Sequence, residues 1–296
     1  MKISILTAAY NRCEAIDKLY QSLVRNSNSD AALEWLIMDD GSTDNTKTKI
    51  EEYIASSNFE IKYFYQENQG KMAAINNLIE HVTGDLIVEC DSDDYWADNA
   101  IRIITAKYAD IKDLNNIYAM VFLKYDKNLC NIGSAFKDDK YKSTMFDLYF
   151  KDGITGDKAL VFIADIRKQY KYILEKNEKF VTEARMFNQM DVQYNVICFN
   201  HPIMICEYLN EGYSNNILKV FKGSPYGYLE YFKALFDFDM KGISPAKRLY
   251  IIKHYILFCY LTKQKHILSS VKGGFNKFLT SVLIIPGYIK SYFMFK

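Results

Sequence analysis

The first 95 residues alternate between short apolar runs and segments with helical spacing. The apolar runs stop at polar residues, which is typical of strands, and they lie at residues 3–8, 34–38, 60–65 and 85–89. The segments between them place apolar side chains three or four positions apart, which predicts helices at residues 15–24, 44–55 and 71–82. Gly84 suits the C-terminal cap of the third helix. Strands alternating with helices predict an α/β fold, with a mostly parallel sheet covered by helices on both faces.

Beyond residue 95 the pattern is weaker but still mixed. Further helices are expected at residues 99–111, 165–174 and 182–190, and further strands at residues 117–123, 159–163 and 194–199. From about residue 217 the spacing is helical, interrupted by Pro225, Gly242 and Pro245. The sequence therefore predicts an α/β domain over residues 1–216 and a helical extension over residues 217–296.

Charge separates the same two parts. The chain of 296 residues has a formal net charge of +1. Residues 1–216 hold 24 Lys and Arg against 33 Asp and Glu, a net charge of −9. Residues 217–296 hold 13 against 3, a net charge of +10, and no acidic residue follows Asp239. This split favours an anionic partner for the second part.

The cysteines and the apolar runs indicate the cellular compartment in which the chain is expected. None of the six cysteines forms a Cys-x-x-Cys pair, and no Cys/His cluster has zinc-finger spacing, so plain thiols in a reducing compartment are expected. The N-terminal residues become polar too soon for a signal peptide. No run of 18 apolar residues occurs, and the longest uncharged run near the C-terminus, residues 278–289, contains Pro286. A membrane-spanning helix is therefore not expected.

Three carboxylates within four residues follow the fourth predicted strand, as Asp91-Ser92-Asp93-Asp94. Carboxylates this close repel one another unless a cation or hydrogen-bond donors lie beside them. Mg²⁺ and Mn²⁺ accept one or two carboxylates when phosphate and water complete the coordination shell. Taken alone, the tetrapeptide is equally consistent with a solvated acidic loop that caps the next helix.

Three other residues are candidates for contacts with a ligand. Tyr10 and Asp40 follow the carboxyl ends of strands, where ligands meet a parallel sheet, and Lys71 stands at a predicted helix start. A carboxylate at Asp40 can accept a hydrogen bond from a base edge, Tyr10 can stack on a base, and Lys71 can meet phosphate or base. Each has a structural alternative: a turn for Asp40, a plug of the strand-to-helix turn for Tyr10, and a solvated side chain for Lys71. Because strand ends share one edge of the sheet, the polar clusters are expected to converge on one site.

Four segments taken together are more specific than any single residue. TAAYNR, IMDDGSTDNT, ENQGKMAAIN and TGDLIVECDSDD, in this order over residues 1–98, closely resemble the N-terminal half of family 2 glycosyltransferases with the GT-A fold. The resemblance implies a Rossmann-like nucleotide-sugar-binding domain and an inverting transferase that uses a nucleotide-diphosphate sugar. Ala8 and Ala9 stand where many relatives carry a hydroxyl or proline, which leaves backbone contacts to the nucleotide there.

The resemblance also implies roles for five residues. Tyr10 would lie near the base, and Asp40 would accept a hydrogen bond from the ring N3–H of uracil. Lys71 occupies the basic position of the family on the base or phosphates. Asp91 would contact the ribose, and Asp93 would be the metal ligand of the Asp-x-Asp motif, holding Mn²⁺ or Mg²⁺.

The second half of the chain resembles, less strongly, a bacterial subgroup associated with surface polysaccharide assembly. The matching segments are residues 156–158, 178–183 and 206–212. In the family an acidic residue in this region deprotonates the acceptor hydroxyl, and Glu183 stands at that position. Such a base is needed because a sugar hydroxyl is a poor nucleophile while it holds its proton. Glu178 and Glu207 are weaker candidates, Asp157 could shape the acceptor site or cap a turn, and Glu183 could instead be a surface acid on a helix.

The resemblance implies a single displacement that inverts the anomeric carbon. The metal at Asp93 would stabilise the departing diphosphate while Glu183 takes the acceptor proton. The expected donor is a UDP-sugar, the expected acceptor is a glycan or a lipid-linked hydroxyl, and no nucleic-acid partner is expected. Two alternatives remain: a catalytically inactive nucleotide-sugar-binding protein, and a sugar nucleotidyltransferase. The second is disfavoured because the loop after the first strand lacks glycine.

The basic extension suggests where the protein works. Residues 241–296 contain 10 Lys and Arg, no acids and 10 aromatic residues. Basic residues beside aromatic and aliphatic faces are typical of helices that lie in a lipid interface. We therefore expect a cytoplasmic protein that associates peripherally with the inner face of the cell membrane. The expected partner there is an anionic membrane surface. The alternative is that these helices pack on protein while their lysines stay solvated.

Overall fold

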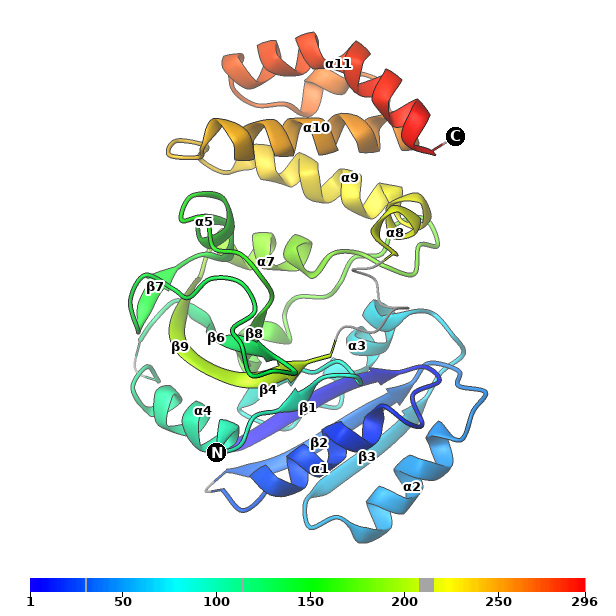
Figure 1. Ribbon diagram of the computed structural model, residues 1–296, viewed down its shortest axis with the longest axis vertical. Coiled ribbons are helices and arrows are strands. Elements are labelled where there is room, and N and C mark those ends of the chain that lie inside the picture. The colour runs from blue at the N-terminus through cyan, green and yellow to red at the C-terminus, as the bar shows by residue number, and fades with distance from the viewer. Residues whose placement is uncertain (30, 113, 208–215, 296) are drawn as a thin grey trace.

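A single mixed β-sheet organises the N-terminal two thirds of the molecule. The structure, a computed structural model, describes residues 1–29, 31–112, 114–207 and 216–295. Within these residues the strands follow the order β3-β2-β1-β4-β8-β6-β9-β5, with β7 paired to β9 (Figure 1). Their bounds are β1 Lys2–Ala9, β2 Ala32–Asp39, β3 Glu60–Tyr65, β4 Leu86–Glu89, β5 Tyr95–Trp96, β6 Ile117–Asp126, β7 Tyr141–Ser143, β8 Lys158–Ile163 and β9 Asn195–Cys206.

The half of the sheet formed by β3, β2, β1 and β4 is parallel throughout. Ile5 of β1, for example, lies opposite Trp35 of β2 and Val88 of β4. This confirms the predicted parallel sheet and brings the carboxyl ends of β1, β2 and β4 to one edge. The second half is mixed, because β8 runs antiparallel to both of its neighbours, β4 and β6. The periodicity of the sequence could not reveal strand direction.

Helices cover both faces of the sheet, as predicted. Because successive residues of a strand point to opposite faces, Ile5 packs in one buried cluster and Leu6 in the other. The first cluster receives side chains from α1 Ile16–Asn26, α2 Thr46–Ser56 and α4 Ala100–Ala109. The second receives side chains from α3 Lys71–Ile79 and α7 Glu183–Asp191. Helices α3 and α7 begin near the edge of the sheet where β1, β2 and β4 end.

Two predicted helices are shorter in the structure. The helix expected over residues 165–174 is only α6, Ala164–Arg167. The third helix ends at Ile79 with Glu80 as its C-cap, so the expectation that Gly84 caps it is wrong. Gly84 instead packs against β1 and donates its backbone N–H to the hydroxyl of Ser4 at 2.9 Å. Its missing side chain permits that close approach.

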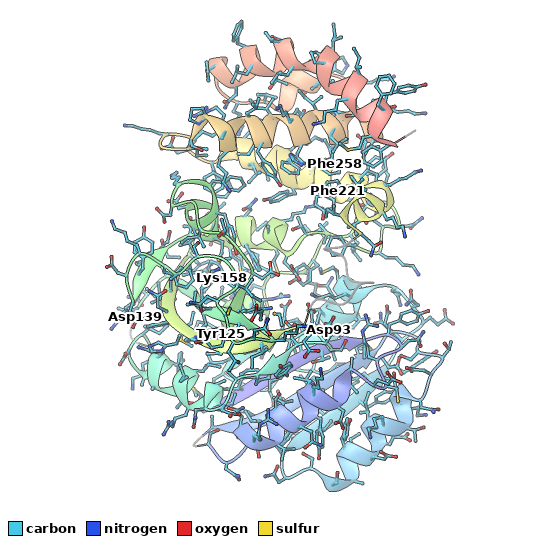
Figure 2. All side chains as sticks on the ribbon, viewed as in Figure 1. Asp93, Tyr125, Asp139, Lys158, Phe221 and Phe258 are labelled. Carbon is cyan, nitrogen blue, oxygen red and sulfur yellow. The ribbon has the colours of Figure 1, made fainter. Side chains whose placement is uncertain are left out.

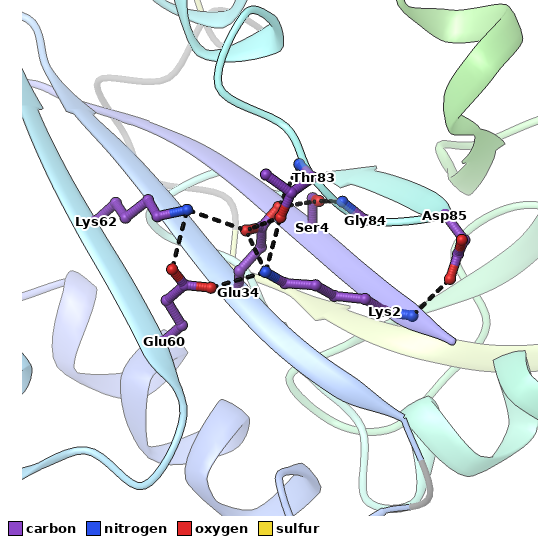
Figure 3. A network of polar contacts seen from close by, with 8 residues as sticks. All are labelled: Lys2, Ser4, Glu34, Glu60, Lys62, Thr83, Gly84 and Asp85. Carbon is purple, nitrogen blue, oxygen red and sulfur yellow. Dashed lines mark hydrogen bonds and ion pairs between the residues drawn. The ribbon is translucent and has the colours of Figure 1, made fainter.

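One buried carboxylate joins the first three strands. Glu34 of β2 is fully buried, and its oxygens accept hydrogen bonds from Ser4 of β1 and from both donors of Thr83 (Figure 3). Lys2 lies 2.8 Å and Lys62 of β3 lies 3.4 Å from Glu34 Oε2. The cluster therefore holds β1, β2, β3 and the loop before β4 in register.

The C-terminal helices form a buried cluster of their own. It contains buried side chains from α8 Ile217–Gly223, α9 Pro225–Ala234, η2 Leu235–Asp237 and α10 Pro245–Leu261. Partly buried side chains of η3 Ile267–Ser270 and α11 Gly274–Phe295 pack against it. Phe221 and Phe258, labelled in Figure 2, pack edge to face here with centroids 5.1 Å apart. Phe146 and Phe150 of α5, Met145–Phe150, belong to the same cluster. The helices thus stack on α5 and α7 (Figure 1), and the domain boundary at residue 216 stays a prediction.

Helix α11 is longer than the uncharged run that the sequence shows near the C-terminus. It continues through Pro286 for 22 residues and contains an 18-residue window with a mean hydropathy of 1.4, so by length and composition it is long and apolar enough to cross a membrane. The helix reaches this length because it includes Lys277 and Lys290, which bound the uncharged run, and the expectation that it does not span a membrane stays a prediction. One face of α11 nevertheless packs on α10: a side chain at Gly287 would meet Ile256 of α10.

Candidate active site

All six residues predicted from the sequence line one cavity. The cavity has a volume of about 960 Å³ and opens at the carboxyl ends of β1, β2 and β4, between the sheet and the C-terminal helices. This volume lies in the upper part of the range typical of small-molecule sites. Figure 2 shows Asp93 at this edge of the sheet. The predicted residues in the lining are Tyr10, Asp40, Lys71, Asp91, Asp93 and Glu183.

Lys71 joins two of the predicted carboxylates. Its Nζ atom lies 2.6 Å from Asp91 Oδ1 and 2.8 Å from Glu183 Oε1. The side chains of Asp91 and Glu183 keep 47% and 41% exposure, so the ion pairs lie in a cleft that admits water. Burial favours the neutral amine, but the two carboxylates raise the pKa of Lys71 well above its usual value. Burial likewise opposes ionisation of Asp91, and Lys71 outweighs it and lowers the pKa of that carboxyl.

The two other acids of the Asp91–Asp94 loop have different surroundings. Asp94 is buried, accepts a hydrogen bond from the Cys206 thiol and pairs with Lys124 at 3.0 Å. Asp93 has no ion-pair partner among the described residues. Burial, followed by the charges of Asp91 and Asp94, raises the pKa of Asp93. Asp93 is thus the carboxylate of this loop whose charge the protein compensates least.

Asp40 supports the loop that follows β3. Its Oδ1 atom accepts hydrogen bonds from the side chain of Gln66 and the backbone of Gln69, and its Oδ2 atom accepts one from Gly70. Gly70 has φ +95°, and a side chain there would meet the backbone of Lys179. Since a carboxylate has about four acceptor positions, one on Oδ2 is left for a ligand. Recognition of a base by Asp40 stays a prediction, and the structure adds a second role for this residue.

Tyr10 lies at the mouth of the cavity. Its side chain is 47% exposed, so it does not plug the turn between β1 and α1. The next residue, Asn11, has φ 52°, and its side chain accepts a hydrogen bond from the backbone of Thr43 at 2.8 Å. This contact fixes the loop after β1 against the loop after β2. It leaves the ring of Tyr10 accessible for stacking.

The weaker candidates for the base have other contacts. Glu178 is buried and accepts hydrogen bonds from the backbone of Tyr226 at 2.7 Å and Gly227 at 2.8 Å, so it caps the N-terminus of α9. Glu207 pairs with Lys18 of α1 at 2.5 Å. Asp157 lines the cavity, and residues 208–212 of the third matching segment lie outside the described residues.

Several cavity residues had no clear signal in the sequence. Lys124 of β6 reaches the acidic loop, although its strand reads as an apolar run. Glu89 of β4 forms a buried ion pair with Arg167 at 2.7 Å and accepts a hydrogen bond from Tyr172 at 2.6 Å. This pair supports the floor of the cavity directly before the acidic loop. The tyrosines contributed by the C-terminal helices were read only as part of an aromatic tail.

The described residues hold no group of three or more His, Cys, Asp or Glu side chains able to bind a metal. A divalent ion at Asp93 would therefore take most of its ligands from water and from the phosphates of a nucleotide. Mg²⁺ commonly binds in this way. An uncompensated, half-buried carboxylate fits this requirement, and the metal role of Asp93 stays a prediction.

The sequence comparisons give the class of the protein. Residues 4–171 match the model of glycosyl transferase family 2, which is more than half of the chain, so the chain belongs to this family. An uncharacterized glycosyltransferase of Mycoplasma pneumoniae is 36% identical over 129 residues, 43% of this chain and 42% of that protein. One from Mycoplasma genitalium is 27% identical over 234 residues, 76% of this chain and 69% of that protein. The chain thus spans less than half the length of the first relative.

Solved structures share the fold. Residues 1–349 of S. aureus TarS in complex with UDP-GlcNAc superpose with a TM-score of 0.66, covering 98% of this chain and 90% of that chain at 15% identity. The mannosyltransferase PcManGT from Pyrobaculum calidifontis, in complex with GDP-Man and Mn²⁺, gives 0.56, covering 99% and 83% at 14% identity. At these identities the likeness shows the fold alone. The chain has the α/β GT-A fold with C-terminal helices, as predicted.

Proposed function

We propose that this protein transfers a sugar from a nucleotide-diphosphate sugar, with UDP favoured, to a hydroxyl of a glycan or a lipid-linked acceptor. The observation that carries the proposal is the link made by Lys71. One amine contacts Asp91, the predicted ribose residue, and Glu183, the predicted base, in the same cavity. Membership of family 2 favours glycosyl transfer over the nucleotidyl-transfer alternative. TarS and PcManGT, which share the fold, are solved with a nucleotide sugar.

The position of each residue in the cavity suggests its role in the proposed reaction. Tyr10 and Asp40 lie beyond β1 and β2 and would hold the base, and Asp91 would hold the ribose. Glu183, at the start of α7, would accept the proton of the attacking hydroxyl. Attack from the face opposite the diphosphate inverts the anomeric carbon. The water-accessible carboxylate of Glu183 lets an acceptor approach it directly.

Asp93 is the proposed ligand of Mn²⁺ or Mg²⁺. The fit rests on its raised pKa and on the absence of an ion-pair partner among the described residues. When bound, the ion would supply positive charge to the leaving diphosphate. The chain contributes the carboxylate that would hold the ion, and Lys71 contributes a positive charge to the same cavity. PcManGT, a relative in fold, is solved with Mn²⁺.

The base assignment can be tested by Glu183→Gln, which keeps the size of the side chain and removes its ability to accept a proton. A general base typically contributes about 10²–10⁴-fold, so transfer should fall by that order while UDP affinity changes little. A screen of nucleotide sugars with and without Mn²⁺ would first identify the donor. Near-normal transfer by the variant would move the role to another residue. Absence of any nucleotide binding would reject the proposed function itself.

We also propose that the protein works at the inner face of the cell membrane, in surface polysaccharide assembly. Helix α11 carries apolar side chains at helical spacing that are at least 46% exposed and lie opposite its α10-facing side, namely Phe275, Phe278, Val282, Ile285, Ile289 and Tyr292. On a helical wheel, Lys277 and Lys290 flank this exposed stripe on both sides. Such a face suits the interface of an anionic bilayer. Because its other face packs on α10, we propose that α11 lies in the membrane surface.

Vesicle sedimentation tests this location. The full chain should bind phosphatidylglycerol vesicles at low salt and bind phosphatidylcholine vesicles less. Ile285→Asp combined with Phe278→Asp should abolish that binding. Val192→Asp is the matched control, since Val192 is an exposed apolar residue outside the tail. Equal binding by the α11 variant, or no binding by the wild type, would reject the membrane proposal.

A further inference from the structure

The cavity extends well beyond the predicted nucleotide site. Its far end is lined by α5 and by helices α8, α9 and α10, which lie outside the family match at residues 4–171 except for α5. Four tyrosines here form what we call the tyrosine wall: Tyr149 of α5, Tyr228 and Tyr231 of α9, and Tyr250 of α10. Lys247 is the one charged residue that the described parts of α8, α9 and α10 contribute to the lining. A ligand at this end should therefore carry little charge.

The tyrosine wall offers both ring faces and hydroxyl groups. Tyr149 donates its hydroxyl hydrogen to the carbonyl of Gly156 at 3.0 Å. The hydroxyls of Tyr228, Tyr231 and Tyr250 bond to no residue that the structure describes. Burial raises the pKa of these three phenols, so each stays protonated and able to donate. Apolar faces combined with unused donors match a sugar ring, which presents C–H faces and hydroxyls, better than a hydrocarbon chain.

An orphaned amide lines the same cavity. Asn188 of α7 is only 5% exposed, and its Nδ2 atom has no hydrogen-bond partner among the described residues. Asn188 lines the cavity, and buried polar groups are almost always paired, so its unpaired donor points to a missing ligand atom. Asn188 follows Glu183 by five residues, about 7.5 Å along the helix axis.

We propose that the tyrosine wall and Asn188 form a binding site for a neutral sugar residue of the acceptor. The C-terminal helices then complete the active site as well as packing beside it. This inference rests on the proposed function, because it assigns the acceptor side of the same cavity. It also explains why Glu178, on the segment leading to α7, is used to hold the N-terminus of α9 in place.

Saturation-transfer NMR on the full chain with saturating UDP tests the site directly. The probes are octyl glycosides of glucose, galactose, mannose and N-acetylglucosamine, with octyl glucuronide as the charged comparison. At least one neutral glycoside should bind, with saturation reaching ring protons more than chain protons, and the glucuronide should bind more weakly. Saturation confined to the alkyl chain would replace the sugar site with a lipid site. No binding by any neutral glycoside would overturn the proposal.

Variants of the tyrosine wall and of Asn188 test whether these residues bind the glycoside. Tyr231→Phe and Tyr250→Phe keep the rings and remove one hydrogen bond each, so each should weaken glycoside binding about 2- to 10-fold. Asn188→Leu should weaken it by a similar factor. Tyr194→Phe is the matched control, because Tyr194 does not line the cavity. Unchanged glycoside affinity in the three variants would refute the assignment.

Affinity for UDP separates this inference from the proposed function. It should stay within about twofold in all variants, because the tyrosine wall lies beyond the nucleotide residues. A wild-type protein that does not bind UDP would instead reject the proposed function. The Phe variants remove one oxygen atom each and are expected to fold, which thermal melting can confirm.

Discussion

The amine of Lys71 lies 2.8 Å from the carboxylate of Glu183, although 112 positions separate the two residues. Lys71 is the first residue of α3 and Glu183 the first residue of α7. Both helices therefore begin at the cavity, where the partial positive charge of a helix N-terminus favours anions. The same amine contacts Asp91, so one cation connects the proposed nucleotide residues with the proposed base. This arrangement leads to the first prediction.

Lys71→Met should weaken UDP binding about 10- to 100-fold, the effect expected on losing a charge-assisted hydrogen bond. Removing the amine leaves Asp91 and Glu183 without their shared cation, and both carboxylates would then repel the diphosphate. Calorimetric titration with UDP measures the change. Lys171→Met is the control, because Lys171 pairs with Glu80 at the exposed surface at 2.6 Å. Equal affinity in wild type and Lys71→Met would contradict the prediction.

Asp93→Asn should remove metal-dependent turnover and raise thermal stability when no metal is present. The raised pKa of Asp93 means that its ionised form is disfavoured in the folded protein, so a neutral side chain relieves that cost at neutral pH. Melting curves with and without Mn²⁺, recorded beside a turnover assay, test both parts. A wild type whose activity survives a chelator would show that the metal role is wrong.

UDP should bind more tightly than CDP by about 1–3 kcal/mol, the cost of leaving a polar group unpaired. Uracil presents a donor at N3, whereas cytosine presents an acceptor that would face the remaining acceptor position of Asp40. Calorimetry with the two nucleotides measures the difference. Equal affinities would remove Asp40 from base recognition and leave it with its contacts to Gln66, Gln69 and Gly70.

Acid should destabilise the fold through Glu34. Burial opposes its ionisation, but hydrogen bonds from Lys2, Ser4 and Thr83 lower its pKa from 4.5 to about 2. A lowered pKa stabilises the fold above the unfolded value of 4.5, and this stabilisation is lost as the pH falls toward 2. Its full size is about 3 kcal/mol. Urea unfolding between pH 6 and pH 2.5 measures the loss.

The control for that experiment is the neutral variant. Glu34→Gln should be less stable at pH 6 and should show less change in unfolding free energy between pH 4.5 and pH 2.5. Glu14→Gln, at an exposed position, should follow the wild type. Parallel pH profiles for Glu34→Gln and the wild type would show that other carboxylates dominate acid unfolding.

The sequence alone was sufficient for the first half of the fold and for placing the polar strand ends in one cavity. Alternating strands and helices are local patterns, and the rules for parallel sheets then place every strand end at one edge. Asp40, Asp91 and Asp93 could therefore be assigned to one site without coordinates. The fold class and the family followed from the same motifs.

Tertiary structure decided the features that depend on contacts between distant segments. Residues 250–261 and residues 278–289 are both mostly apolar. Most of the first segment is buried whereas the second exposes a stripe, because only packing selects which face is covered. Glu178 became a cap for α9 because the chain brings that helix start beside it. Strand β8 runs antiparallel for a similar reason, since direction depends on pairing rather than on periodicity. Local patterns specify elements, whereas long-range packing determines which side chains meet in the cavity.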